Sequence, residues 1–268
     1  MKRFFSIQFR LFCLPVLAIL CTIAGYSNNI KPQQEFYEIK IYHLTTTAQE
    51  KIVDDYLQHA YLPALHKAGF GTVGVFKPLT NDTSADKLVY VFMPLKSMEQ
   101  LLSLPIQLEK DAEYKTAAAF YLNAVYNNPA YARMESILLR AFRLAPQMKL
   151  PKLGGAVSDR IFELRSYESP SEKLYLNKVQ MFNEGGEIPL FDRLGFNAVF
   201  YADVINGSHM PNLMYMTSFE NKSIHDEKWK AFGSDPEWKK LSALPEYQHN
   251  VSRADIILMR AADYSDIR

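Results

Sequence analysis

The sequence predicts an α+β fold in which two ferredoxin-like β-α-β-β-α-β repeats pack sheet to sheet as a single-chain α/β barrel. The strand-like stretch "FYEIKIY" at 36–42 returns as "IFELRSY" at 161–167, and further matched residues follow each copy in the same order. A period of about 120 residues is typical of a duplicated domain rather than a solenoid. In a strand at 88–93 both faces are apolar, so each sheet needs a cover that the other repeat can provide.

The periodicity gives the same order of elements in both repeats. The first repeat is predicted at 35–142 and the second at 161–262, joined by a linker at 143–160 that is rich in Pro and Gly. Alternating polarity predicts strands, and apolar residues at helical spacing predict helices. The elements expected in the first repeat are a strand at 36–42, a helix to about 65, strands at 72–77 and 88–93, a helical region at 97–127 and a strand at 135–142.

Local signals mark where the first helix of each repeat begins and bends. Thr47 with Glu50, and Ser169 with Glu172, have the spacing of a capping box, in which a hydroxyl and a carboxylate satisfy free amides at the helix start. Pro63 and its counterpart later in the chain are expected to bend or divide the helix, because proline removes one backbone hydrogen bond.

The first 27 residues differ from the rest of the chain. Three basic residues precede or flank an apolar stretch at 11–25, which is too short to span a bilayer comfortably but suits the core of a signal peptide. We therefore expect 1–27 to be a signal peptide and the protein to be exported, either periplasmic or secreted. Cleavage after Ala24 and cleavage after Ser27 both fit the sequence. Once the leader is removed, no membrane association is expected.

The composition is that of an ordinary globular protein. The chain has 268 residues, of which 48% are hydrophobic and 22% charged, and the net charge is +1. Such a balance gives no electrostatic reason to expect nucleic acid as a partner.

Several motifs together resemble a known family. These are the two repeated strands, a proline ahead of a Gly-Phe pair in each copy, and "SDPEWKKL" at 234–241. They are similar to the NIPSNAP family of the dimeric α/β-barrel superfamily, present here as tandem copies. The first copy has "DAEY" at 111–114 where the family pattern prefers Asp-Pro-Glu-Trp. The resemblance implies a single-chain dimeric α/β barrel and implies little about activity, because the superfamily hosts unrelated functions.

The repeated strands carry the main candidate ligand-binding residues. In each strand a carboxylate, a cation and a tyrosine alternate with apolar residues and so share one face. An arginine on the last strand of each repeat is expected beside them. The residues are Glu38, Lys40, Tyr42 and Arg140 in the first repeat, and Glu163, Arg165, Tyr167 and Arg260 in the second. They form either an internal ion-pair network or the polar lining of a pocket in the barrel.

Other motifs give weaker candidates. Asp55 and His59 are four residues apart on a helix, so the carboxylate can orient the imidazole as a general base. The motif "GFGTVG" at 69–74 follows a helix and enters a strand, which is the wrong context for dinucleotide binding. No histidines have the spacing of metal ligands. The sequence therefore predicts no cofactor and no metal site.

Two functional hypotheses follow. The first is an exported binding or accessory protein that holds a small, partly apolar molecule in or beside the barrel. The second, implied by the resemblance, is an enzyme similar to the cofactor-independent oxygenases or haem-handling members of the superfamily. Strong chemistry usually requires a cluster of titratable groups, and none is evident in the sequence, which favours the first. The sequence leaves open whether any reaction is catalysed, which ligand binds, and whether the protein is a homo-oligomer.

Overall fold

Eight antiparallel strands of the computed structural model close into one barrel in the order β1-β3-β2-β8-β5-β7-β6-β4. The structure describes residue 1 and residues 33–268, so all but the first residue of the expected leader at 1–27 lies outside the described residues. The elements of the first half are β1 (Phe36–Leu44), α1 (Thr47–Tyr56), the π-helical η1 (Leu57–Tyr61), α2 (Leu62–Lys67), β2 (Gly74–Pro78), β3 (Lys87–Leu95), α3 (Met98–Lys110), α4 (Ala112–Ala117), α5 (Ala119–Leu122) and β4 (Arg133–Ala141).

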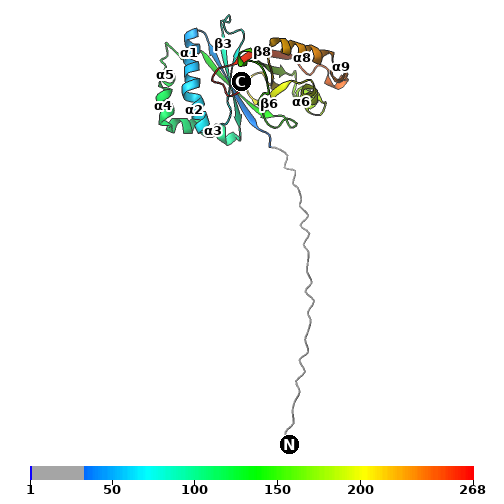
Figure 1. Cartoon of the computed structure of the whole chain (residues 1–268), viewed down its shortest axis with the longest axis horizontal. Helices are drawn as coiled ribbons and strands as arrows, with labels where there is room; N and C mark the ends of the chain where they lie inside the picture. The colour runs from blue at the N-terminus through cyan, green and yellow to red at the C-terminus, as the bar shows by residue number, and fades with distance from the viewer. Residues whose placement is uncertain (2–32) are drawn as a thin grey trace. The chain divides into compact units, whose positions relative to one another are not determined.

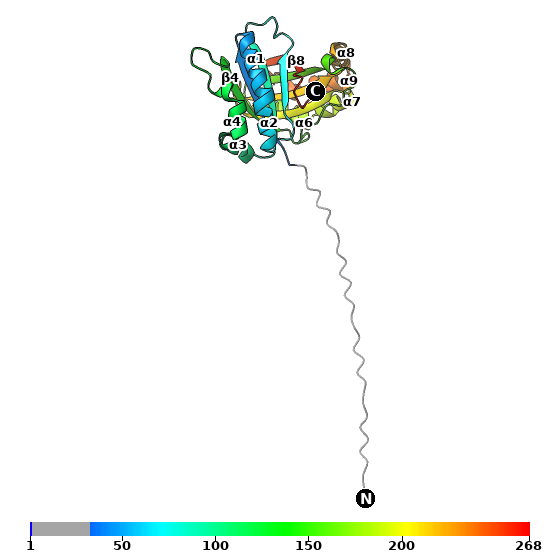
Figure 2. The same ribbon diagram turned by 60° about the vertical axis from the view of Figure 1, so that its left-hand side comes forward.

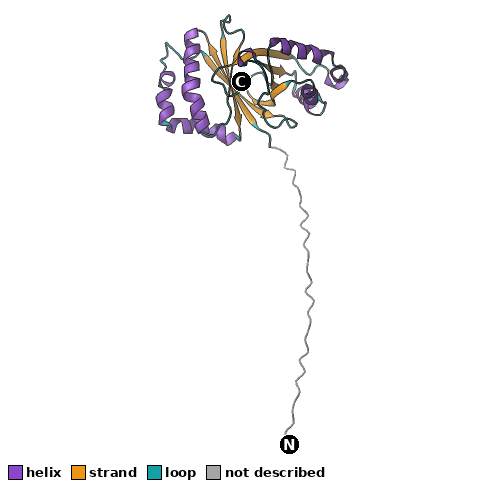
Figure 3. Cartoon of the chain, in the orientation of Figure 1, coloured by secondary structure: helices purple, strands orange, loops and turns teal. Residues whose placement is uncertain are grey.

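The second half repeats the β-α-β-β-α-β order of the first. Its elements are the 3-10 turn η2 (Val157–Asp159), β5 (Ile161–Glu168), α6 (Glu172–Asn183), α7 (Glu187–Arg193), β6 (Asn197–Asn206), β7 (Asn212–Phe219), α8 (Lys222–Ser234), α9 (Pro236–Ser242), the 3-10 turn η3 (Pro245–Tyr247) and β8 (Arg253–Ala261). The helices of the two halves lie on opposite outer sides of the strands (Figure 1, Figure 3). The predicted barrel fold is confirmed.

The halves are joined edge to edge as well as face to face. Each half has the strand order β4-β1-β3-β2 or its equivalent β8-β5-β7-β6, and the outer strands pair across the halves. Strand β2 pairs with β8, where Phe76 lies opposite Ala261, and β4 pairs with β6, where Arg140 lies opposite Asp203. These two joints are equivalent, as a pseudo-two-fold axis requires. Closure removes the sheet edges that would otherwise expose unpaired backbone groups.

One apolar cluster fills the barrel interior and draws on both halves. Aromatic rings from the first half contact rings from the second: Phe92 stacks on Phe200 with ring centroids 4.8 Å apart, and Phe76 lies 4.8 Å from Phe162. All four side chains are at most 2% exposed. Burying each such ring stabilises the fold by about 1.5–3 kcal/mol, so the two halves depend on one another for stability.

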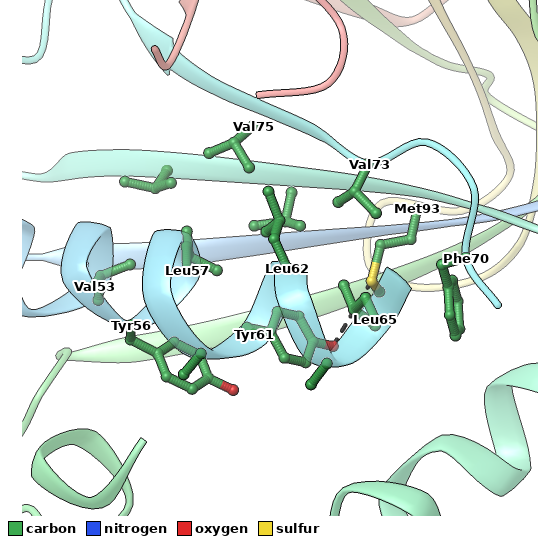
Figure 4. Packing of buried hydrophobic residues seen from close by; sticks show 14 of the residues in the cluster. Val53, Tyr56, Leu57, Tyr61, Leu62, Leu65, Phe70, Val73, Val75 and Met93 are labelled. Atoms are coloured by element: carbon green, nitrogen blue, oxygen red, sulfur yellow. Dashed lines mark hydrogen bonds between the residues drawn. The ribbon is translucent and has the colours of Figure 1, made fainter. Parts of the chain in front are cut away.

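A second apolar layer in each half lies between the outer face of the sheet and the helices. Figure 4 shows this layer in the first half, where Leu57 and Leu62 of the helix face Val75 and Met93 of the strands. Figure 2 shows α1 and α2 lying across the strands of the first half. A corresponding cluster in the second half is built around Phe191. The sheet is therefore covered on both of its faces.

The first helix of each half is interrupted, as expected near its proline. In the first half the five residues of η1 form a π-helical turn that ends just before Pro63, and the amide of Leu62 bonds back to the carbonyl of Leu57. In the second half Gly186, with φ of 96°, separates α6 from α7. Glycine tolerates that left-handed conformation without a steric penalty.

The capping residues differ from those predicted. Thr46, rather than Thr47, accepts the amide of Gln49 at 3.1 Å. In the second half Ser171, rather than Ser169, accepts the amide of Leu174 at 3.4 Å. The cap is the residue whose backbone is still extended where the helix starts, and the spacing of hydroxyl and acidic residues does not identify it when several hydroxyls are adjacent.

Candidate functional site

A pocket of about 160 Å³ opens at one end of the barrel, and strands of both halves line it. We call it the barrel mouth. Along each lining strand an apolar residue lies deeper and a second side chain, two positions along, lies nearer the strand end. The lining residues are Ile41, His43, Leu88, Tyr90, Glu135, Ile137, Leu164, Ser166, Ser208, His209, Asn212, Met214, Asp255 and Ile257. The walls are therefore apolar, and most of the polar groups lie near the opening.

Two histidines of the barrel mouth lie beside carboxylates. The ring nitrogens of His43 lie 2.9 Å from Asp86 Oδ2 and 2.9 Å from Glu135 Oε1. Each ring nitrogen of His43 therefore already has a carboxylate partner. His209 has its Nδ1 3.0 Å from Glu168 Oε1, and its side chain is half exposed.

The deepest polar atom of the barrel mouth is the hydroxyl of Tyr90. This residue is only 4% exposed, and its hydroxyl makes no hydrogen bond with any described residue. Burial raises the pKa of Tyr90 well above its usual value, and the charges of Glu135, Asp86 and Asp255 raise it further. The hydroxyl therefore keeps its proton at physiological pH.

The strand residues predicted from the sequence lie elsewhere. Glu38, Lys40 and Tyr42, like Glu163, Arg165 and Tyr167, lie on the face of the sheet that the helices cover. The barrel interior is lined instead by residues of the opposite parity, such as Ile39, Ile41 and Leu164. The structure brings each trio together within its own half.

In the second half the trio forms a fully bonded buried network. Glu163 is 0% exposed; its Oε1 accepts from Arg165 Nε at 2.7 Å, and its Oε2 accepts from Trp229 Nε1 at 2.5 Å. His225 Nε2 lies 3.1 Å from the same Oε2. The Arg165 guanidinium also lies 3.6 Å from the centroid of the Trp229 ring and donates to the Tyr167 hydroxyl at 2.8 Å. No space is left for a ligand at the carboxylate.

The first-half trio is less well paired. Glu38 Oε1 accepts from Ser136 at 2.6 Å and lies 3.9 Å from Lys40 Nζ, whereas its buried Oε2 has no hydrogen-bond partner among the described residues. Lys40 donates instead to the hydroxyl of Tyr61 at 2.7 Å. Glu38 does not line the barrel mouth.

The arginines and the helical pair do not make the contacts that the sequence predicted. Arg140 binds Asp203 of β6 at 3.3 Å, and Arg260 makes no ion pair within residues 33–268, so neither pairs with a strand carboxylate. The expectation was wrong because closure of the barrel gives β4 a new neighbour. Asp55 is bound by Lys51 at 2.8 Å, and no hydrogen bond joins it to His59, which is exposed on the outer helix layer.

Residues of the barrel mouth were missed by the sequence reasoning. His43 was the residue that the sequence could most easily have revealed. It lies two positions after Ile41, which itself lies two positions after Ile39, so its side chain points to the same inner face of the strand. Within the described part of the chain no three His, Cys, Asp or Glu side chains cluster as metal ligands. None of the helices described here is long and apolar enough to cross a membrane.

Comparison with known proteins relates the second half to a family. The family model NIPSNAP matches residues 162–266. The second half of the chain is therefore similar to the NIPSNAP family. No curated protein matches the chain. A "putative monooxygenase" from Fusobacterium nucleatum subsp. nucleatum is similar in structure, at 7% identity and a TM-score of 0.55, over 85% of this chain and 93% of its own.

Two further solved structures are similar to part or most of the chain. A "putative monooxygenase" from Lactobacillus acidophilus is 8% identical with a TM-score of 0.53, over 85% of this chain and 94% of its own. A NIPSNAP family protein from Agrobacterium tumefaciens is 20% identical over 41% of this chain and 95% of its own, with a TM-score of 0.36. At such identities the two whole-chain similarities show a shared fold, the single-chain dimeric α/β barrel.

Proposed function

We propose that the protein binds a small, partly apolar molecule in the barrel mouth. The observation that carries the proposal is a pocket with an apolar inner wall and polar groups near its opening, lined by strands of both halves. Its volume of about 160 Å³ is close to that of a protein cavity of about 150 Å³ that holds one benzene ring. The ligand is therefore of one-ring size.

The polar networks around Glu163 and Glu38, on the helix-covered face of the sheet, support this assignment because they are excluded as ligand sites. Glu163 accepts from Arg165 and Trp229 and lies beside His225, and Glu38 lies beneath the helices and does not line the barrel mouth. Their polar side chains therefore act within the fold, where they fix the helices on the sheet. The barrel mouth combines enclosed apolar volume with polar groups that are not all saturated.

Titration with one-ring probes tests the proposal. Ser208 lines the barrel mouth and is exposed, so Ser208→Trp adds bulk at the opening without entering the core. Ser158→Trp is the matched control, because Ser158 is exposed on η2 and does not line the pocket. We expect Ser208→Trp to weaken calorimetrically measured binding of ethylbenzene and acetophenone about ten-fold or more and Ser158→Trp to leave it unchanged. Equal binding by both variants would show that the probes bind outside the barrel mouth and would contradict the proposal.

A second candidate function is cofactor-independent oxygenation. His209 favours it, since Glu168 lies at one ring nitrogen and the other nitrogen has no bond within the described chain, as a general base requires. The description of two proteins of the same fold as "putative monooxygenase" points the same way. The reaction would convert a substrate CH₂ group and O₂ into a carbonyl group and water, so the substrate supplies all the electrons.

Oxygen consumption separates this enzyme from a binding protein. We would measure O₂ uptake with one-ring and two-ring substrates that carry an activated CH₂ group. An oxygenase loses uptake in His209→Ala and keeps it in His249→Ala, which changes an exposed histidine outside the barrel mouth. If the protein binds the ligand but consumes no O₂, the oxygenase function is excluded and the binding function is kept.

We also propose that residues 1–27 direct export to the periplasm or the medium. The basic start and the apolar stretch at 11–25 support this. Fractionation of cells that express the full chain, with N-terminal sequencing of the exported form, tests it. Cleavage after Ala24 or Ser27 is the expected result, and an uncleaved chain in the cytoplasm would contradict it.

A further inference from the structure

Tyr90 lines the barrel mouth, and its hydroxyl makes no hydrogen bond with the described residues. The residue is only 4% exposed. Some buried tyrosines are paired within the protein: the hydroxyls of Tyr56 and Tyr114 lie 2.9 Å apart, and Tyr61 accepts from Lys40, whereas the hydroxyl of Tyr201 has no partner among the described residues and does not line the barrel mouth. Buried polar groups are almost always hydrogen-bonded, because an unpaired one costs free energy. The Tyr90 hydroxyl is therefore expected to bond to whatever fills the pocket.

The charges around the pocket restrict what can fill it. Glu135 and Asp255 line the barrel mouth at equivalent positions of β4 and β8, and Asp86 lies beside it. The basic side chains that face them are at the edge: His43 lies between two of these carboxylates, and Arg253 lies 3.1 Å from Asp255. The three carboxylates all act on the Tyr90 hydroxyl in the direction that keeps its proton. A carboxylate or phosphate in the pocket would meet like charges.

These observations assign a chemical class to the ligand. We infer that the barrel mouth takes an uncharged one-ring molecule with a carbonyl oxygen that accepts a hydrogen bond from Tyr90. The carboxylates exclude anionic analogues, and the apolar walls hold the ring. This inference rests on the proposed binding function and adds the ligand class and the residue that selects it.

Three probes of nearly equal size test the ligand class on the full-length protein. Acetophenone has a ring and a carbonyl, ethylbenzene has the same shape without the oxygen, and benzoate adds the negative charge. We expect acetophenone to bind about three- to ten-fold more tightly than ethylbenzene, the range for one hydrogen bond. Benzoate is expected to bind at least about ten-fold more weakly than acetophenone.

The variant Tyr90→Phe tests the residue. It should remove the preference for acetophenone over ethylbenzene and leave ethylbenzene affinity unchanged, which also shows that the variant is folded. Tyr126→Phe is the control, since Tyr126 is 96% exposed. Benzoate binding as tightly as acetophenone, or an unchanged preference in Tyr90→Phe, would overturn the inference while the proposed function survives. Binding of none of the probes would overturn the proposed function itself.

Discussion

Glu38 and Glu163 occupy the same position in their repeats, yet their surroundings differ. Glu163 accepts from Arg165 and Trp229 and lies beside His225, all within 3.1 Å. Glu38 has one short bond, from Ser136, and a buried oxygen without a partner among the described residues. The repeated strand motif does not by itself determine what its carboxylate does.

The difference originates in the helix that covers each strand. Helices α3 and α8 have thirteen residues each and end at the equivalent caps Asp111 and Asp235. Counting back from these caps, the positions of His225 and Trp229 in α8 are Leu101 and Pro105 in α3. The first half has lost the donors and kept the acceptor. A strand motif is therefore informative only together with the helix face that packs on it.

The most buried ion pair gives the largest expected effect. Lys178 and Glu187 lie 2.8 Å apart, with side chains 5% and 3% exposed. The first half has apolar or uncharged residues at the equivalent positions. Counting from the helix caps places Val53 at the position of Lys178, and counting from the prolines places Tyr61 at that of Glu187. Lys178→Val should lower the free energy of unfolding by about 3–5 kcal/mol, because it leaves a buried carboxylate unpaired. Urea unfolding measures this change.

A double variant controls for loss of packing. Lys178→Val with Glu187→Tyr copies the pair of the first half, so it should recover most of the stability that the single change removes. A double variant as unstable as the single one would show that the charge is not the cause.

The two strand carboxylates give the direct comparison. Glu163→Gln should destabilise by about 2–3 kcal/mol, because the buried guanidinium of Arg165 loses its charged acceptor. Glu38→Gln should cost less than about 1 kcal/mol, because Lys40 is 3.9 Å away and partly exposed. Equal losses in urea unfolding would contradict the difference between the halves.

The helix caps should show the smallest effect and the same sign in both halves. Arg193 holds the pKa of Asp235 below its usual value, helped by the amides of Glu237 and Trp238, and Lys67 does the same for Asp111. A lowered folded-state pKa contributes stability that is present above the ordinary aspartate value of about 3.9 and is lost as the pH falls through the folded-state value.

Thermal unfolding across pH measures the cap effect. Asp235→Asn and Asp111→Asn should each melt below the unmodified protein at pH 7. The difference should shrink as the pH falls below about 4 and disappear once the aspartates are protonated. A difference that is constant with pH would mean that the carboxylate charge does not stabilise the caps.

The sequence predicted the architecture because both repeats record it in the same way. The strand at 36–42 and its copy at 161–167 alternate with period two, and that alternation requires two covered faces. Matching the repeats by sequence at a constant spacing of 125 residues aligns Tyr90 with Tyr215, and the structure shows that this alignment is wrong. Tyr90 lies opposite Ile41 and points into the barrel, whereas Tyr215 lies opposite Arg165 and points toward the helices. The spacing between equivalent residues changes by one from the first strand to this strand, so a residue aligned by sequence points to the opposite face of the sheet. The apolar pattern of the strand does not reveal this change, because both of its faces are apolar.

The barrel mouth could not be predicted because no segment contains it. Most of its residues come in pairs from the ends of six strands, spread along the chain from position 41 to position 257. Only the pairing of β2 with β8 and of β4 with β6 brings them together. The expected contact of Arg140 with Glu38 failed for the same reason, because Asp203 reaches Arg140 across the closed joint.

Methyl NMR during titration with acetophenone tests the central claim most directly. With labelled isoleucine and methionine, we expect saturable shifts at Ile41, Ile137 and Met214, which line the barrel mouth. The methyl groups of Met181 and Ile188, which lie in the second-half helix layer, should remain unchanged. Shifts confined to the helix layer, with the three barrel-mouth methyl groups silent, would contradict the account.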